Sequence, residues 1–154
     1  MKKQAYLFGY GKQGRAIAQG LKEEEFRLHI VESSAENYEA AKADGYVDVS
    51  LIDITKDEAL EALMVENDDY LVCVMDDAHI NVFLILSLRA LFPSTTILAI
   101  SDSIYTTQKL VMAGATKVID LYNVSANRIH RILKKPVATK LLDGFITPDG
   151  GISF

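Results

Sequence analysis

The 154-residue sequence has a single cysteine, Cys73, inside the apolar run DYLVCVM. One thiol cannot form an internal disulfide, and it cannot supply the several sulfur ligands of a cysteine zinc site. Because free cysteine is among the residue types most often buried, we expect Cys73 to be a buried structural residue.

The sequence also lacks a long apolar segment. A membrane-spanning helix needs about 20 such residues, and the longest apolar run here, NVFLILSLRALF, is interrupted by Arg89. The N-terminal stretch MKKQAYLFGYGK has no signal-peptide core before its glycines. We therefore expect a cytoplasmic protein.

Blocks of positive charge are scarce as well. The formal net charge is −5, and acidic residues are spread along the chain. A protein that binds a nucleic-acid backbone needs a clustered basic surface. Direct binding to nucleic acid is therefore not expected.

Few residues are suited to catalysis. There are three histidines, and the sequence shows neither a Ser-His-Asp spacing nor an H-E-x-x-H motif. His29 falls in a predicted strand and His130 in the last predicted helix, which favours structural or interface roles. The stretch DDAHIN has two interpretations, a cation site at Asp76, Asp77 and His79 or a helix start with Asp77 as N-cap. The helix start is the simpler one, so no catalytic residue and no metal ligand is predicted.

The segments that are present alternate between strand and helix patterns. Six β-rich runs, AYLFG, RLHIVE, YVDVSLI, DYLVCVM, TTILAIS and TKVIDL, are separated by segments with a period near 3.6. ITKDEAL contains a capping box of Thr55 and Glu58, and Gly45 and Gly114 follow two helical stretches. Runs that are apolar on both faces indicate a parallel sheet covered by helices on both sides. We predict an α/β fold with a doubly wound, Rossmann-like parallel sheet.

The alternation stops near Pro136. We therefore predict one nucleotide-binding domain at residues 1–135 and a C-terminal arm or truncated linker at 136–154, where glycine and proline are more frequent.

The stretch FGYGKQG carries the clearest motif. Gly9, Gly11 and Gly14 match G-x-G-x-x-G between a predicted strand and a predicted helix. The first glycine allows a tight turn, the second lets the backbone approach a pyrophosphate, and the third allows close packing of the helix. The free N–H groups of that helix would face the phosphates.

An acidic residue completes the dinucleotide-binding pattern. Glu32 ends the next predicted strand, eighteen residues after Gly14. A carboxylate there can accept hydrogen bonds from ribose hydroxyls and repels a 2′-phosphate. NAD or an adenosine nucleotide is therefore favoured over NADP.

Five motifs in order resemble the RCK/KTN (TrkA-N type) family, the nucleotide-binding domains that regulate potassium channels and potassium uptake systems. They are FGYGKQGRAIAQGL, HIVESSAE, IDITKDEAL, VMDDAHINVFLILSLRALFP and LVMAGATKVI, and they span about residues 4–136. The resemblance implies a six-stranded sheet in the order 3-2-1-4-5-6. It also implies a domain that senses a ligand rather than an enzyme.

The resemblance also implies a set of ligand-binding residues. Around the phosphates it places Gly9, Tyr10, Gly11, Lys12, Gln13 and Gly14; at the ribose, Glu32 and Ser33; beside the adenine, Asp53 and Ile54; and at the lip of the crevice, Met75. The implied ligands are NAD(H), AMP or ADP. Family members often carry an arginine at the position of Ile100, so ATP is expected to bind less well.

The implied partners are a second copy of the chain and a membrane-embedded potassium pore on the same or another chain. The helix VSANRIHRILKKP is the expected homodimer element, because Val124, Ile129, Ile132 and Leu133 form an apolar stripe. A ring of several dimers is also compatible with the resemblance. The domain would act at the inner face of the cell membrane. The alternative function is that of a small NAD-dependent oxidoreductase, although little chain remains after the sixth strand to build a substrate pocket.

Overall fold

The computed structural model describes residues 3–21 and 25–134. The chain divides between Ile119 and Asp120 into two units. The predicted arm at 136–154 lies outside the described residues, and the predicted domain boundary stays a prediction. Among the described helices, none combines the length and the apolar character of a membrane span.

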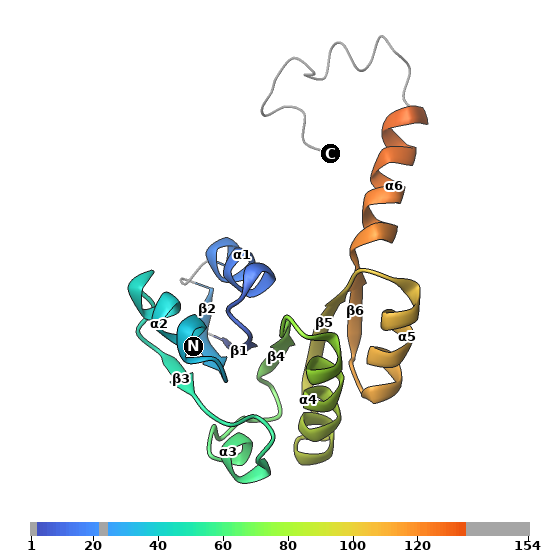
Figure 1. Cartoon of the computed structure of the whole chain (residues 1–154). Coiled ribbons are helices and arrows are strands. Elements are labelled where there is room, and N and C mark those ends of the chain that lie inside the picture. Colours follow the sequence, from blue (N-terminus) through green and yellow to red (C-terminus); the bar gives the residue numbers. More distant parts are fainter. Residues whose placement is uncertain (1–2, 22–24, 135–154) are drawn as a thin grey trace. The chain divides into compact units, whose positions relative to one another are not determined.

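The six predicted strands are all present and form one sheet (Figure 1). They are β1 (Lys3–Phe8), β2 (Phe26–Glu32), β3 (Val49–Leu51), β4 (Tyr70–Cys73), β5 (Thr96–Ser101) and β6 (Lys117–Asp120). Their order is β3-β2-β1-β4-β5-β6, with parallel pairing of β1 to both β2 and β4. The predicted Rossmann-like order 3-2-1-4-5-6 is confirmed.

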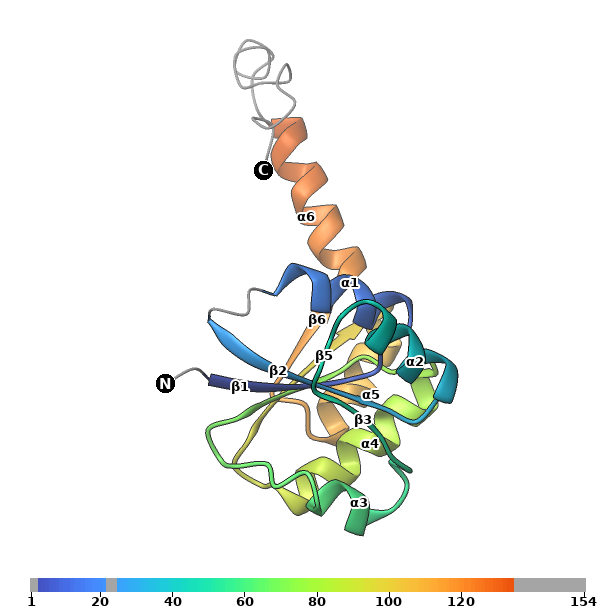
Figure 2. The same ribbon diagram turned by 90° about the vertical axis from the view of Figure 1, so that its left-hand side faces the viewer.

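Helices cover both faces of the sheet, as the apolar strands require (Figures 1 and 2). The described helices are α1 (Lys12–Gly20), α2 (Ala35–Ala43), α3 (Asp57–Glu61), α4 (Ala78–Leu91), α5 (Ile104–Ala113) and α6 (Leu121–Lys134). Helices α1 and α2 lie on one face, and α3, α4 and α5 lie on the other. Helix α6 belongs to the second unit.

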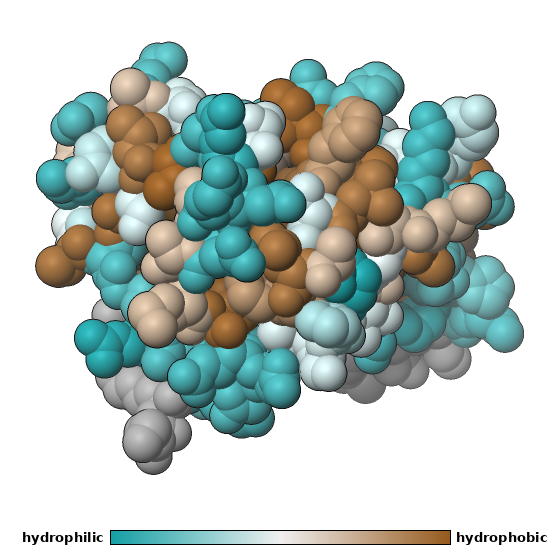
Figure 3. Space-filling view, turned by 90° about the horizontal axis from the view of Figure 1, so that it is seen from below, coloured by the Kyte–Doolittle hydropathy of each residue, from teal (hydrophilic) through white to brown (hydrophobic). Residues whose placement is uncertain are grey.

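The core consists of two apolar clusters, one on each face of the sheet. Strand β1 contributes to both, because Ala5 and Leu7 face α1 and α2 whereas Tyr6 and Phe8 face the other helices. Cys73 is completely buried, as predicted, and burial raises the pKa of its thiol. On the face that Figure 3 shows, hydrophobic side chains are interspersed among hydrophilic ones.

Capping explains where several helices begin and end. Asp77 is the N-cap of α4, because its carboxylate accepts hydrogen bonds from the N–H groups of His79 and Ile80. Gly114 ends α5 with φ +124°, a conformation that favours glycine. These two predictions from the sequence are confirmed.

The predicted capping box at Thr55 is wrong. The N-cap of α3 is Lys56, and it makes no side-chain capping hydrogen bond. Instead, the N–H and the hydroxyl of Thr55 donate to Oδ1 of Asp53 at 3.0 and 2.5 Å. The side chain of Asp53 therefore closes a local turn with Thr55. This turn engages the Thr55 hydroxyl that the capping box would have used at the start of α3.

Arg89 holds together the ends of several elements at the amino edge of β5. Its guanidinium donates to the carbonyl oxygens of Gly114, Phe92, Pro93 and Thr95 and to Oγ1 of Thr116, at 2.9 to 3.3 Å. In the sequence, Arg89 only interrupts an apolar run, so its hydrogen-bonding role is visible only in the fold.

None of the residues of helix α6 is buried. Its start is fixed by Asp120, whose Oδ1 accepts hydrogen bonds from the N–H groups of Tyr122 and Asn123, both at 3.0 Å. Val124, Ile129 and Leu133 are exposed by 48, 57 and 73%. Three of the four residues in the apolar stripe that the sequence predicts are therefore exposed, and the fourth, Ile132, is partly buried.

Candidate functional site

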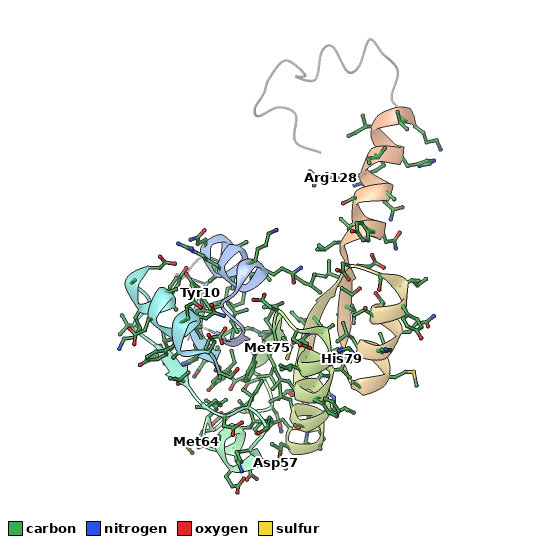
Figure 4. All side chains as sticks on the ribbon, in the orientation of Figure 1. Tyr10, Asp57, Met64, Met75, His79 and Arg128 are labelled. Carbon is green, nitrogen blue, oxygen red and sulfur yellow. The ribbon has the colours of Figure 1, made fainter. Side chains whose placement is uncertain are left out.

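The candidate site lies at the carboxyl edge of the sheet, where the glycine-rich turn follows β1. In a parallel sheet all strands end at the same edge, and the strand order reverses here between β1 and β4. The segment after β4 therefore lies beside the turn, with Val74 N–H donating to the Phe8 carbonyl at 2.9 Å. Figure 4 labels Tyr10 of the turn and Met75 of the neighbouring segment.

Two of the three glycines are required by contacts within the turn region. Gly9 has φ +112°, and a Cβ atom on it would lie 2.7 Å from the carbonyl oxygen of Val74. A Cβ atom on Gly14 would lie 1.8 Å from the carbonyl oxygen of Gly9. Neither position accommodates a side chain without movement of the backbone, so the tight turn and close packing predicted for these glycines are both present.

Gly11 has a different neighbour. A Cβ atom on Gly11 would lie 1.9 Å from Oδ2 of Asp76, which follows β4. Gly11 is the N-cap of α1, no side chain caps this end of the helix, and its first turn contains no acidic residue. The second glycine thus makes room for a carboxylate of the protein beside the helix N-terminus.

Glu32 is held firmly in place. It is 1% exposed, and its carboxylate accepts four hydrogen bonds. The donors are the backbone N–H groups of Tyr10 (2.6 Å), Ser33 (2.9 Å) and Ser34 (3.0 Å) and the side-chain amide of Asn37 (3.1 Å). Glu32 therefore joins the glycine-rich turn to the segment after β2. Binding of a ribose by Glu32 would require an exchange of one of these hydrogen bonds.

Tyr10 contributes its backbone to the turn, while its side chain is buried under α2. The phenol is 2% exposed and donates to Oδ2 of Asp44 at 2.5 Å. Burial, followed by the hydrogen bond to Asp44, raises the pKa of Tyr10. Arg15 of α1 forms an ion pair with the same Asp44 at 3.1 Å. The ring of Tyr10 therefore supports the turn from the side of α2.

Two hollows flank the turn. The first, which we call the β4–β5 hollow, is lined by Lys12, Gln13, Met75, Asp76, Ala78, Asn81, Ile100, Ser101, Asp102, Thr106 and Leu110. The second, the β2–β3 hollow, is lined by Ser33, Ala35, Leu51, Ile52 and Asp53. The structure thus brings Lys12, Gln13 and Met75 together on one side of the turn and Ser33 with Asp53 on the other.

Ile54 lies apart from this group. It is 5% exposed and belongs to the core cluster on the face of α3 to α5. It also lines a separate apolar hollow with Ile80 and Phe83 of α4. The neighbouring Asp53 is exposed, and the hydroxyl and the N–H of Thr55 lower the pKa of its carboxyl. The predicted contact of Ile54 with an adenine stays a prediction.

Asn81 is a site residue that the reasoning from sequence missed. It is 4% exposed, its Oδ1 accepts from Met75 N–H at 3.0 Å, and its amide donates to the Cys73 carbonyl at 3.0 Å. These bonds fix the segment that carries Met75 and Asp76. The motif DDAHIN contains Asn81. Its hydrogen bonds depend on how the chain turns between the end of β4 and the first turn of α4.

The histidines do not line either hollow. His79 is exposed beside Asp77 at the start of α4 (Figure 4). His29 stacks on Tyr6 and pairs with Gln4 and Asp48. Within residues 3–21 and 25–134, no group of three or more His, Cys, Asp or Glu residues is placed to hold a metal ion.

The sheet order, the glycine-rich turn at the switch point and the buried acid at the end of β2 define a Rossmann-like domain of the dinucleotide-binding type. The family model of the TrkA-N domain matches residues 5–121. The chain therefore belongs to the TrkA-N family.

Two curated relatives come from Methanocaldococcus jannaschii. Potassium channel protein 1 is 28% identical over 144 residues, which cover 93% of this chain and 43% of the relative. Probable potassium channel protein 2 is 27% identical over 143 residues, which cover 91% of this chain and 41% of the relative. The chain thus spans less than half the length of the curated relatives that it matches.

Solved structures share the fold at low identity. The NAD(P)-binding domain of an exopolyphosphatase-related protein from Archaeoglobus fulgidus is 18% identical with a TM-score of 0.74, covering 88% of this chain and all of that chain (100%). The GsuK channel bound to NAD is 22% identical with a TM-score of 0.67, covering 86% of this chain and 23% of that chain. GsuK bound to ADP is 22% identical with a TM-score of 0.68, covering 86% of this chain and 34% of that chain.

Proposed function

We propose that this chain is a ligand-sensing regulatory domain that binds NAD(H) or an adenine nucleotide and controls the gating of a potassium channel or transporter. The observation that carries the proposal is the glycine-rich turn at the switch point, flanked by two hollows. Family membership supports it, as do the relatives, which are named as potassium channel proteins. The proposed site of action is the inner face of the cell membrane, beside a pore on the same or another chain.

The two hollows provide room for the two halves of a dinucleotide. The adenosine would lie in the β2–β3 hollow beside Ser33 and Asp53, with its ribose near Glu32. The pyrophosphate would cross the turn at the N-terminus of α1, where backbone N–H groups face the ligand. The second half would enter the β4–β5 hollow beside Lys12 and Met75. The related GsuK is described with NAD in one structure and with ADP in another, which supports both ligand classes.

A regulatory role accounts for the site better than hydride transfer. A dehydrogenase needs a group that handles the substrate proton next to the nicotinamide. His29 and His79, the two histidines of the first unit, line neither hollow. A regulatory domain needs only different ligand affinities in two arrangements.

The first experiment measures binding by isothermal titration with NAD⁺, NADH, AMP, ADP and ATP. Saturable binding of NAD(H), AMP or ADP, and weaker binding of ATP, is expected. An absence of binding to all five would refute the proposal. Consumption of NADH with a broad panel of carbonyl substrates would instead favour the alternative oxidoreductase.

Self-association through α6 is the second part of the proposal. Val124, Ile129 and Leu133 expose an apolar stripe that a second copy of the chain would cover. Ile129→Asp is expected to shift the chain from dimer to monomer in sedimentation velocity, whereas the polar control Asn127→Asp leaves the dimer unchanged. A parent chain that is monomeric at all concentrations would contradict this part alone.

A further inference from the structure

The carboxylate of Asp76 lies where a phosphate is expected to approach helix α1. Its two oxygens would be 1.9 and 2.4 Å from a Cβ atom on Gly11, so they occupy the space that the second glycine leaves open. Gly11 is the N-cap of α1, where anions are stabilised by free N–H groups. A negative group of the protein therefore already stands at the position that favours negative charge.

The charged residues of the β4–β5 hollow also disfavour a strongly negative ligand group. Asp76 and Asp102 line the β4–β5 hollow, and Lys12 is its only cationic lining residue within the described part of the chain. The remaining lining includes the apolar Ile100 and Leu110. This half of the site offers more negative than positive charge, together with an apolar wall.

Candidate ligands differ in the charge that they bring to this hollow. A terminal phosphate monoester carries about −1.5 to −2 charges at pH 7. The phosphates inside a dinucleotide are diesters, with one negative charge each, and the oxidised nicotinamide ring is a planar cation. The reduced ring has the same size but no charge.

We infer that Asp76 is a specificity-determining residue, which favours NAD⁺ over NADH and over nucleotides that end in a phosphate at the β4–β5 hollow. Repulsion between Asp76 and a terminal phosphate weakens ADP, and attraction between Asp76 and the oxidised ring strengthens NAD⁺. The inference rests on the proposed function and goes beyond it, because it names the preferred redox state of the nicotinamide ligand and the residue that distinguishes NAD⁺ from NADH.

The test compares Asp76→Asn with its parent by isothermal titration of NAD⁺, NADH and ADP. A chelator is included so that no divalent cation bridges phosphate and carboxylate. Asn has nearly the shape of Asp without the charge. The ratio of the ADP to the NAD⁺ dissociation constant is expected to fall about fivefold, mainly because ADP binds more tightly. The preference for NAD⁺ over NADH is expected to fall as well.

Asp68→Asn is the matched control. Asp68 is exposed and precedes β4, so it lies toward the opposite edge of the sheet from Asp76. The same change in net charge there should leave both ratios unchanged. Asp76→Ala serves as a second variant, because it removes the charge without adding an amide that donates to a phosphate.

The outcomes separate this inference from the proposed function. If the parent binds none of the nucleotides, the proposed function fails. If the parent binds them and both Asp76 variants keep its ratios, Asp76 does not determine specificity, although the proposed function stands. Equal shifts in Asp68→Asn would also overturn the inference. A shift confined to the Asp76 variants, and smaller at high salt, would support it.

Discussion

The backbone N–H of Tyr10 donates to Oε2 of Glu32 at 2.6 Å, so the residue between the first two glycines is bound to the acid that ends β2. The acid of the dinucleotide-binding pattern is therefore also a structural anchor of the turn. Ser33, Ser34 and Asn37 occupy its other acceptor positions.

Glu32→Ala is expected to lower the free energy of unfolding by about 2–3 kcal/mol, because several partly or fully buried N–H groups lose their acceptor. Glu32→Gln should lie between Ala and the parent, since it retains one acceptor oxygen. Urea denaturation measures the order. The exposed Glu39→Gln on α2 is the control, and a Glu32→Ala variant as stable as this control would contradict the anchoring role.

Gly14→Ala and Gly20→Ala form a matched pair on α1. A Cβ atom at Gly14 meets the Gly9 carbonyl at 1.8 Å, so we expect a loss of about 1–3 kcal/mol and weaker nucleotide binding. A Cβ atom at Gly20 meets nothing within 4 Å. Gly20→Ala should therefore be neutral or stabilising by up to about 1 kcal/mol. Thermal melting with and without NAD⁺ measures both effects, and similar melting of the two variants would count against the packing argument.

Because the pKa of the Tyr10 phenol is raised, we expect the free energy of unfolding to fall at alkaline pH. Burial and the bond to Asp44 raise the pKa of its phenol above the ordinary value of 10.0. As the pH rises past that value, the unfolded chain releases the phenol proton while the folded chain keeps it, so stability falls. This contribution is complete below about pH 10 and is lost toward the folded-state pKa.

Tyr10→Phe should therefore lose less stability than the parent as the pH rises above about 10, measured by urea denaturation at each pH. At neutral pH it is expected to be less stable by about 1 kcal/mol, because Asp44 loses a hydrogen bond. Tyr105→Phe is the control at a position that is 68% exposed, and its pH profile should follow the parent. A Tyr10→Phe profile that is parallel to the parent would refute the prediction.

Arg89→Lys is expected to cost about 2–4 kcal/mol, although it conserves the charge. An ammonium group cannot reach the four carbonyls and the Thr116 hydroxyl that the planar guanidinium binds. Arg27→Lys on β2, where the side chain is exposed, should be neutral. Chemical denaturation of the two variants tests this, and equal stability would show that the charge alone matters at position 89.

The sequence predicted the parts of the fold that depend on local pattern. Alternation in β1 separates Leu7 from Phe8 onto opposite faces, and the glycines specify a turn that no side chain fits. The parallel order followed from the family resemblance together with strands that are apolar on both faces. The local error at Thr55 arose because Asp53 competed for the hydroxyl that the capping box required.

Local patterns in the sequence were enough to predict the six strands, the glycine-rich turn, Glu32 at the end of β2 and the N-cap at Asp77. The folded chain was needed to show that Asp76 fills the space at Gly11, that the Glu32 carboxylate accepts four hydrogen bonds and that Arg89 joins the ends of several helices and strands. The two groups differ because local periodicity sets only the face on which a side chain lies. Which distant partner a side chain meets depends on the crossovers that bring separate strands to one edge of the sheet.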